Sequence, residues 1–393
     1  MRVGINALFL LPGKVGGTEI YTRNITRHLL EKDNSNEYVI FINRESAGVF
    51  EELASGPNVP PNLLKVVLCP VWAENRPLRI LWEQFILPFQ VKSHRIDVLL
   101  SGGMTAPFLC PAKSALVIYD LQHVNQPRNF STFHLFFLRT IIYLSAKSSD
   151  AIITLAQKGK DDITKHYGVP PEKVSVVHTR VDEKSFFVRS EEEVTAVKRR
   201  YDLPDRFILY PAASLPHKNH RRLLQAFKLV RGEGREGDLK LLLVGSRDYG
   251  REELERNIRE LALEEDVILL GWLPYEDIPP LYSAALALVF PSLHEGFGMP
   301  VVEAMACGTP VVCSGIEPMG EVAGDAALFV DPLSPEDIAA GILRVLEDEG
   351  LSEGLVKKGF ERSRHFSWEV AASKTLSVLQ SLAGPGGKEK KGR

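Results

Sequence analysis

Short apolar runs alternate with helical patterns along almost the whole chain, and this alternation is the feature that most limits how it can fold. The runs are short and lack the polar and apolar alternation of a strand with one face in water. Strands that are apolar on both faces belong to parallel sheets covered by helices on both sides. The sequence therefore predicts an α/β protein.

Two stretches open with the same strand–loop–helix plan. The run Arg2–Leu10 leads through a glycine-rich loop into a helical pattern that Thr18 is predicted to cap, and Phe207–Pro211 leads into a helix that Asn219 is predicted to cap. Each start predicts its own doubly wound domain. The other predicted strands are Tyr38–Ile42, Leu64–Leu68, Asp97–Leu100, Ala115–Ile118, Ala151–Thr154, Val174–Val177, Leu239–Val244, Val267–Leu270, Leu286–Phe290, Thr309–Cys313 and Ala327–Val330.

The predicted boundary between the two domains lies near Val181–Ser190, where the alternation of strand and helix patterns stops. We expect a first domain over residues 1–185 and a second over 186–367. A last helix, about 368–383, follows the second sheet. The glycine-rich and basic tail, 384–393, is predicted to be disordered.

Composition excludes several functional classes. With 45% hydrophobic and 25% charged residues the chain is an ordinary globular protein, and a net charge of −3 argues against nucleic acid as a partner. Four scattered cysteines predict neither a disulfide framework nor a zinc cluster and indicate a reducing cytoplasm. No apolar segment reaches the roughly 18 residues of a membrane span. No metal-binding pattern occurs, so neither a metal nor a cofactor is predicted.

The most informative segment is the loop and helix after the strand that ends at Phe290. Ligands of open α/β sheets bind outside the carboxyl ends of the strands. Here Glu295 lies in a loop, Gly298 permits a turn, and Pro300 fits the first turn of a helix that Gly308 ends. Free amides over 298–301, including those of Gly298 and Met299, predict a phosphate site at the helix start. Glu303 lies one turn inside this helix, where its carboxylate could accept hydrogen bonds from a ribose diol.

A second candidate site has a cation in the loop just before a predicted helix. Lys218 lies in the loop after Phe207–Pro211, where the helix dipole disfavours a positive charge. Its ammonium group could neutralise a phosphate. The alternatives, a solvated lysine here and a capped helix with solvated acids at Glu295 and Glu303, stay open.

Two first-domain loops carry weaker signals. Gly16 and Gly17 open a helix at the end of the first strand, in a pattern that is neither a dinucleotide fingerprint nor a Walker loop. Asp120 and His123 follow a first-domain strand and could move a proton or hold a sugar hydroxyl. Capping by Asp120 and ordinary packing of His123 are equally good interpretations.

These motifs together resemble the retaining GT-B glycosyltransferases of family 4, also called group 1. The strongest element is the E-x7-E pattern Glu295–Glu303 within HEGFGMPVVEAMACGTPVV. Support comes from Gly16–Gly17, LPHKN, the run Leu269–Ala285 and EVAGDAALFVDP. The resemblance implies two Rossmann-like domains that face each other across a cleft, with the last helix, 368–383, crossing back to the first domain.

The resemblance also implies roles for single residues. The backbone at Gly16–Gly17 would approach the donor diphosphate, and Lys218 would neutralise it as it leaves. Glu295 would bind hydroxyls of the donor sugar, and Glu303 would hold the ribose. The backbone near Leu273 would contact the base.

The chain departs from the family pattern in its first domain. Members often carry His-Asp where this chain has Tyr119-Asp120, so the usual histidine is displaced to His123 or absent. The two residues before Lys218 are Pro216 and His217, without the arginine that is usual in the family. Neutralisation of the diphosphate would therefore depend on one cation.

The predicted function is transfer of a hexose, of the mannose or glucose type, from a nucleoside diphosphate sugar to a hydroxyl of a glycan or lipid-linked acceptor. LPHKN is similar to the block of some mannosyltransferases and favours GDP-mannose. A sugar-nucleotide epimerase or phosphorylase of the same architecture, and a non-catalytic nucleotide-sugar binder, are the alternatives. The enzyme is expected in the cytoplasm; the oligomeric state stays open.

A contact with the inner membrane face is also an open alternative. The segment Arg76–Arg95 mixes aromatic and basic residues and could lie on an anionic membrane. A core-facing helix with solvated basic ends is the favoured interpretation.

Overall fold

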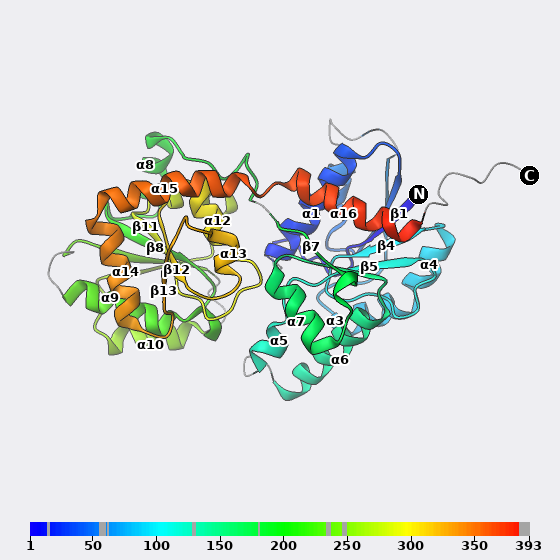
Figure 1. Cartoon of the computed structure of the whole chain (residues 1–393), viewed down its shortest axis with the longest axis horizontal. Helices are drawn as coiled ribbons and strands as arrows, with labels where there is room; N and C mark the ends of the chain where they lie inside the picture. The colour runs from blue at the N-terminus through cyan, green and yellow to red at the C-terminus, as the bar shows by residue number, and fades with distance from the viewer. Residues whose placement is uncertain are drawn as a thin grey trace, which may run out of the picture. The chain divides into compact units, whose positions relative to one another are not determined.

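The computed structural model of the 393-residue chain describes every residue except 14–15, 55–59, 61–62, 128–130, 180, 233–236, 246–249 and 385–393. Two compact units are present, and each has its own sheet (Figure 1). Unit 1 comprises Met1–Thr179 and the chain from Ser367 onward, and unit 2 comprises Arg180–Phe366. The sequence placed these junctions at 185/186 and 367/368. The tail predicted to be disordered lies, after Gly384, outside the described residues.

Unit 1 is built on a seven-stranded parallel sheet in the order β3-β2-β1-β4-β5-β6-β7. The strand order reverses beside β1, so the sheet is doubly wound as predicted. Its strands are β1 (Arg2–Asn6), β2 (Glu37–Ile42), β3 (Leu64–Leu68), β4 (Val98–Ser101), β5 (Lys113–Val117), β6 (Ala151–Thr154) and β7 (Val174–Val176).

The helices of unit 1 include the last helix of the chain. α16 (Trp368–Ala383) packs against α1 (Gly17–Lys32), where the Trp368 ring lies 5.9 Å from Tyr21 and 6.3 Å from His28, centroid to centroid. The predicted return of this helix to the first domain is confirmed. The others are α2 (Ala47–Ala54), α3 (Arg76–Phe85), α4 (Leu87–Ser93), α5 (Gln122–Asn125), α6 (Thr132–Ser148), α7 (Gln157–Tyr167) and the 3₁₀ turn η2 (Pro171–Lys173).

The start of α1 differs from the prediction. The helix begins at Gly17 with Gly16 as its N-cap, so the expected cap at Thr18 is wrong. Gly16 has φ 57° and ψ −128°, a conformation that residues with a Cβ avoid. Glu19 Oε2 accepts the N–H of Gly13 at 2.8 Å, so a side chain from inside the helix secures the loop.

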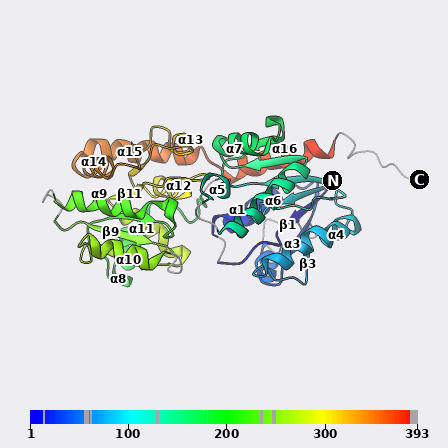
Figure 2. The same ribbon diagram turned by 90° about the horizontal axis from the view of Figure 1, so that it is seen from below.

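Unit 2 is built on a six-stranded parallel sheet in the order β10-β9-β8-β11-β12-β13, with helices on both faces (Figures 1 and 2). Its strands are β8 (Phe207–Pro211), β9 (Lys240–Val244), β10 (Val267–Gly271), β11 (Ala287–Phe290), β12 (Val311–Ser314) and β13 (Leu328–Val330). Its helices are α8 (Glu191–Arg200), η3 (Pro216–Lys218), α9 (His220–Gly232), α10 (Arg251–Glu260), η4 (Tyr275–Asp277), α11 (Ile278–Ala284), α12 (Met299–Ala306), α13 (Met319–Ala323), α14 (Pro335–Glu347) and α15 (Glu349–Arg364).

The order of the second sheet determines which loops meet. β8 and β11 are hydrogen-bonded neighbours at the point where the strand order reverses. The loops after two such strands diverge to opposite faces and leave a crevice at the carboxyl edge, which is where α/β sheets bind ligands. Among the described residues, none of the helices has the length and apolar character needed to cross a bilayer.

Candidate functional site

A lysine and a glutamate meet at the carboxyl edge of the second sheet. Lys218 ends η3, after β8, and Glu295 lies in the loop between β11 and α12. The Lys218 ammonium donates to Glu295 Oε1 at 2.6 Å, and their side chains are only 17% and 11% exposed. It also lies 5.5 Å from the centre of the Phe290 ring. Because the pair is shielded from water, its field acts more strongly than that of a surface pair.

Side-chain bonds to neighbouring loops hold Lys218 in place. Asn219 has φ 62°, a left-handed conformation that asparagine tolerates. Its Nδ2 donates to the carbonyls of Pro291 at 2.9 Å and Pro332 at 2.7 Å, so Asn219 connects its own loop to the loops after β11 and β13. Asn219 is the C-cap of η3. The Tyr210 hydroxyl donates to the Lys218 carbonyl. The backbone that carries the ammonium group is therefore fixed before a ligand arrives.

The start of α12 supplies fewer free amides than the sequence predicted. Pro300 has no N–H, and the N–H of Val301 donates to the Gly298 carbonyl at 3.0 Å. The N–H groups of Gly298 and Met299 have no partner among the described residues and remain available. Gly298 has φ 99°, and a Cβ on it would lie 2.4 Å from the Met319 methyl carbon, so only glycine fits this turn.

Glu303 is held by a tyrosine that the sequence analysis did not single out. The Tyr282 hydroxyl, from α11, donates to Glu303 Oε2 at 2.7 Å. Burial raises the pKa of the Glu303 carboxyl to about 7, and the bond from Tyr282 opposes that shift. The only sequence signal for Tyr282 was its place within the run Leu269–Ala285.

The predicted base-contacting backbone follows β10. Trp272 is 66% exposed and Leu273 is buried, so successive residues alternate between solvent and core. The carbonyl of Gly271 accepts the N–H of Gly245 at 2.9 Å, which joins the ends of β10 and β9. This backbone therefore lies at the same edge of the sheet as Lys218.

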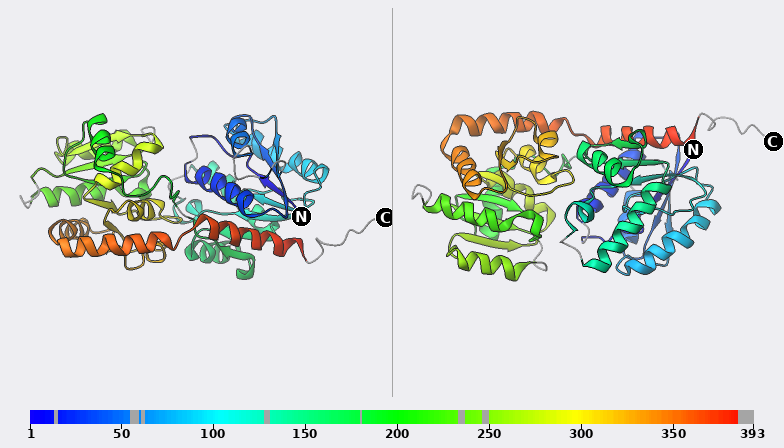
Figure 3. Two further views of the ribbon diagram at one scale, coloured as in Figure 1. Left: turned by 90° about the horizontal axis from the view of Figure 1, so that it is seen from above. Right: turned by 60° about the horizontal axis from the view of Figure 1, so that its bottom comes forward.

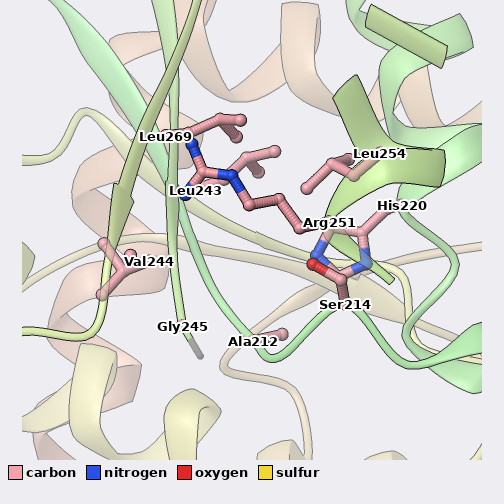
Figure 4. Close-up of a pocket in the computed structure, with 10 residues that line it drawn as sticks. Ala212, Ser214, His220, Leu243, Val244, Gly245, Arg251, Leu254 and Leu269 are labelled. Atoms are coloured by element: carbon pink, nitrogen blue, oxygen red, sulfur yellow. The ribbon is translucent and has the colours of Figure 1, made fainter. Parts of the chain in front are cut away.

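A pocket opens at the ends of β8, β9 and β10 (Figure 4). Arg251 reaches along it and bonds Glu255 Oε1 through Nε at 2.6 Å. Burial lowers the pKa of His220, two residues after Lys218, to about 4, so this ring is neutral at pH 7. The lining residues are Ala212, Ser214, His220, Leu243, Val244, Gly245, Arg251, Leu254, Leu269 and Gly271.

The first-domain candidates, Asp120 and His123, both make local contacts within unit 1, and Leu121 rather than Asp120 is the N-cap of α5. Asp120 Oδ1 accepts the N–H of Gln122 at 3.1 Å, beside the start of α5. His123 is 3% exposed, and its Nε2 lies 2.6 Å from the Tyr167 hydroxyl. Burial lowers the pKa of His123 to about 4. A neutral, enclosed imidazole favours packing, so this placement does not support the catalytic role predicted for His123.

Tyr119, the residue before Asp120, is also enclosed. The Tyr119 hydroxyl donates to the Gly102 carbonyl at 2.9 Å, and its ring meets Tyr21 edge-on at 5.4 Å. Gly16 and Gly17 form the first turn of α1 in this same unit. The structure therefore assembles Lys218, Glu295, Gly298, Met299, Glu303 and Leu273 in unit 2, and Gly16, Gly17, Asp120 and His123 in unit 1.

No cluster of three or more His, Cys, Asp or Glu side chains suited to a metal ion occurs within the described ranges. The four cysteines, Cys69, Cys110, Cys307 and Cys313, are free thiols.

Known families match both units. "Glycosyltransferase Family 4" matches residues 15–185, and "Glycosyl transferases group 1" matches residues 192–362. The two matches together cover most of the chain.

Curated relatives share part of their length with the chain. O-antigen chain mannosyltransferase B of Escherichia coli is 34% identical over 63% of this chain and 64% of its own. O-antigen chain mannosyltransferase RfbU of Salmonella typhimurium is 31% identical over 58% of this chain and 59% of its own. The chain therefore spans about three-fifths of these relatives.

Solved structures share the fold over nearly the whole chain. HepE of Anabaena, solved in complex with UDP-glucose, superimposes with a TM-score of 0.74 at 20% identity, over 97% of this chain and all of its own. At this identity the likeness establishes architecture: two Rossmann-like halves of the GT-B type.

Proposed function

We propose, from the premise that the chain belongs to the GT-B glycosyltransferases of family 4, that it transfers a hexose from a nucleoside diphosphate sugar to a hydroxyl of a glycan or lipid-linked acceptor. The observation that carries this proposal is the shielded Lys218–Glu295 pair at the switch point of the second sheet. It places the Lys218 cation, which follows β8, beside Glu295, a hydrogen-bond acceptor in the loop that leads to the start of α12.

The ammonium group of Lys218 would stabilise the leaving diphosphate. Breaking the anomeric C–O bond leaves negative charge on the diphosphate, and preorganised charges are most effective against such a barrier. An ammonium group has three N–H donors, so Lys218 can keep its bond to Glu295 while it donates to phosphate oxygens. The amides of Gly298 and Met299 would add neutral donors to the same anion.

Glu295 would orient the sugar rather than attack it. Its carboxylate already accepts from Lys218, which lowers its nucleophilicity and leaves its second oxygen for hydroxyl groups of the hexose. We therefore propose retention of configuration, with the acceptor attacking from the face that the diphosphate leaves and passing its proton to the departing phosphate. Positioning of the donor would supply much of the rate enhancement.

GDP-mannose is our first choice of donor. The curated relatives named above are mannosyltransferases, and the block LPHKN, which contains Lys218, is similar to that of some mannosyltransferases. The pocket beside Gly271 and Arg251 is the place we assign to the nucleoside. We also propose that transfer needs no metal ion, because the Lys218 ammonium group would supply positive charge and the amides at the start of α12 would supply hydrogen bonds to the diphosphate.

A donor panel tests this function directly. We expect GDP-mannose to raise the melting temperature more than UDP-glucose or ADP-glucose, since a ligand at 100 times its Kd adds about 2.7 kcal/mol of stability. Labelled hexose should then appear in an oligosaccharide or lipid-linked acceptor, also with EDTA present, and NMR should show the anomeric configuration of the donor. Turnover of donor alone would favour an epimerase or phosphorylase, and binding without turnover a non-catalytic binder.

The ionisation of Glu303 predicts a pH dependence. Its pKa of about 7 lies above that of a free carboxyl, so Glu303 loses its proton as the pH rises through 7. The ionised form is the better acceptor for a ribose diol, so kcat/KM for the donor should rise across this range, mainly through KM.

Tyr282→Phe provides the matched test of that dependence. The variant removes a bond that favours the ionised carboxyl, so the inflection should move to higher pH. Glu303→Gln should remove the inflection altogether. A wild-type inflection that survives in Glu303→Gln would contradict the assignment.

A further inference from the structure

Two buried imidazoles adjoin the Lys218–Glu295 ion pair, one on each of the loops that carry it. His217 precedes Lys218 in η3, and His294 precedes Glu295 in the loop between β11 and α12. The two histidines are only 6% and 9% exposed. The Leu293 N–H donates to the His217 carbonyl at 2.7 Å, which joins the two loops at this point. We call His217 and His294 the histidine pair.

The strand order brings the histidine pair to the ligand-binding edge of unit 2. β8 and β11 are neighbours where the order reverses, and both loops follow the carboxyl ends of these strands. Figure 3 shows this unit from two further sides, with the β8 segment in green and the segment from β11 to α12 in yellow. The histidine pair therefore lies beside the ammonium group to which we assign the diphosphate.

One nitrogen of the histidine pair is buried without a hydrogen bond. His294 Nε2 is enclosed, and it has no partner among the described residues. A buried polar atom in this condition costs free energy and requires a physical explanation. An imidazole nitrogen can gain a partner when a ligand binds or when a proton enters the site, because its role as donor or acceptor changes with protonation.

The protein's own groups disfavour a proton on His217. Burial lowers the pKa of His217 to about 4, and the charge of Lys218 contributes to this shift. Glu295 acts in the opposite direction, and His294 in the same direction as Lys218. His220 also faces His217, and burial lowers its pKa to about 4 as well. Glu295 already accepts from Lys218, so little negative charge is left to stabilise an imidazolium.

A bound diphosphate would reverse this balance, because a nearby anion favours the charged form of an imidazole. We propose that the histidine pair takes up a proton from solvent when the donor binds, and so gives the diphosphate a second cation beside Lys218. The proton resides on a ring nitrogen of the pair as a whole, and it returns to solvent when the diphosphate leaves. The inference rests on the proposed function, since it needs the diphosphate next to Lys218.

A cation that forms only with the ligand has a physical advantage at this place. The sequence predicted that one cation would neutralise the diphosphate, because His217 and Pro216 precede Lys218 without an arginine. A permanent second cation beside the mostly buried Lys218 would repel it whenever no anion is bound. A neutral imidazole avoids that repulsion in the free protein and still supplies positive charge in the complex.

Proton counting by calorimetry tests the proposal. Titration of the full chain with GDP-mannose, in buffers of different ionisation enthalpy, gives the number of protons taken up per donor bound. The diphosphate of this donor is esterified at both ends, so it exchanges no proton of its own near pH 7. At pH 6 we expect the wild type to take up at least about half a proton more than His217→Gln/His294→Gln. The ratio of the variant's Kd to that of the wild type should rise by about threefold from pH 7 to pH 6.

A second variant removes the other group that titrates in this range. Glu303, whose pKa is about 7, would release a proton as it binds the ribose, and this release opposes the uptake. Glu303→Gln keeps the histidine pair intact, so this variant should show uptake directly, by at least about half a proton per donor at pH 6. It carries the test by itself if the double histidine variant does not fold.

His166→Gln, at an exposed position of α7 in unit 1, is the matched control and should keep the wild-type proton number. Melting temperatures show which variants are folded. Equal proton numbers in the wild type and the folded double variant, or no uptake in Glu303→Gln, would overturn the inference while donor binding and the proposed function stand. Failure of every nucleoside diphosphate sugar to bind would overturn the proposed function and the inference together.

Discussion

Lys218→Ala should lower kcat by about a thousandfold, the scale of losing one preorganised charge opposite a developing anion. The ammonium group would contact the leaving diphosphate, so its interaction grows as the C–O bond breaks, and KM should change less than kcat. The backbone of residue 218 is held by bonds from Tyr210 and Asn219 to main-chain carbonyls, so the loop should keep its shape in the variant.

Steady-state transfer from GDP-mannose measures this effect. Lys228→Ala, which removes an exposed lysine from the following helix, is the matched control and should retain wild-type kcat. Circular dichroism separates loss of chemistry from loss of fold. Near-normal turnover in a folded Lys218→Ala protein would contradict the proposed mechanism, which depends on the Lys218 ammonium group.

Glu295→Gln should lower kcat/KM by about a hundredfold while keeping the size of the side chain, since a charged acceptor for hydroxyl groups is roughly twice as strong as a neutral one and orientation is lost with it. It also removes the negative partner from Lys218. The ammonium group is then free to bind phosphate more tightly, so affinity for free GDP should not fall with the rate.

The double variant tells whether the two residues act as one unit. Lys218→Ala alone leaves the mostly buried Glu295 carboxylate without its cation and should cost about 2 kcal/mol of stability. Lys218→Ala/Glu295→Gln should recover part of that loss, because the uncompensated charge is gone. Glu353→Gln, at an exposed position of α15, is the control. Additive losses of rate and stability would show that the ion pair does not couple the two groups.

The segment from Glu295 to Glu303 shows how much of a site local sequence can predict. Gly298 and Pro300 define a turn and a first helical position by backbone chemistry alone, so the sequence placed the start of α12 correctly. The number of free amides was overestimated, since Pro300 has none and Val301 bonds back to Gly298. Lys218 was conspicuous for a similar reason, because a cation before a helix opposes the dipole.

Contacts between residues that are far apart in the chain could not be predicted from local sequence in this way. Tyr282 bonds Glu303, and Asn219 bonds the loops after β11 and β13, only because the strand order brings those elements together. Nothing local distinguishes a tyrosine that binds a carboxylate from one that fills a core. His123 illustrates the opposite case: the sequence predicted a catalytic loop residue, but it lies in the short helix α5 and is enclosed beside Tyr167.

The sequence by itself determined the parallel strands, their division between two sheets and the loops that carry polar groups, because apolar runs and turn residues act through neighbours in the chain. The tertiary structure alone decided that Lys218 meets Glu295, that Tyr282 holds Glu303, and that Phe89 and Phe136 face solvent. Periodicity shows that a helix has an apolar side, but only packing decides how much of that side the rest of the protein covers.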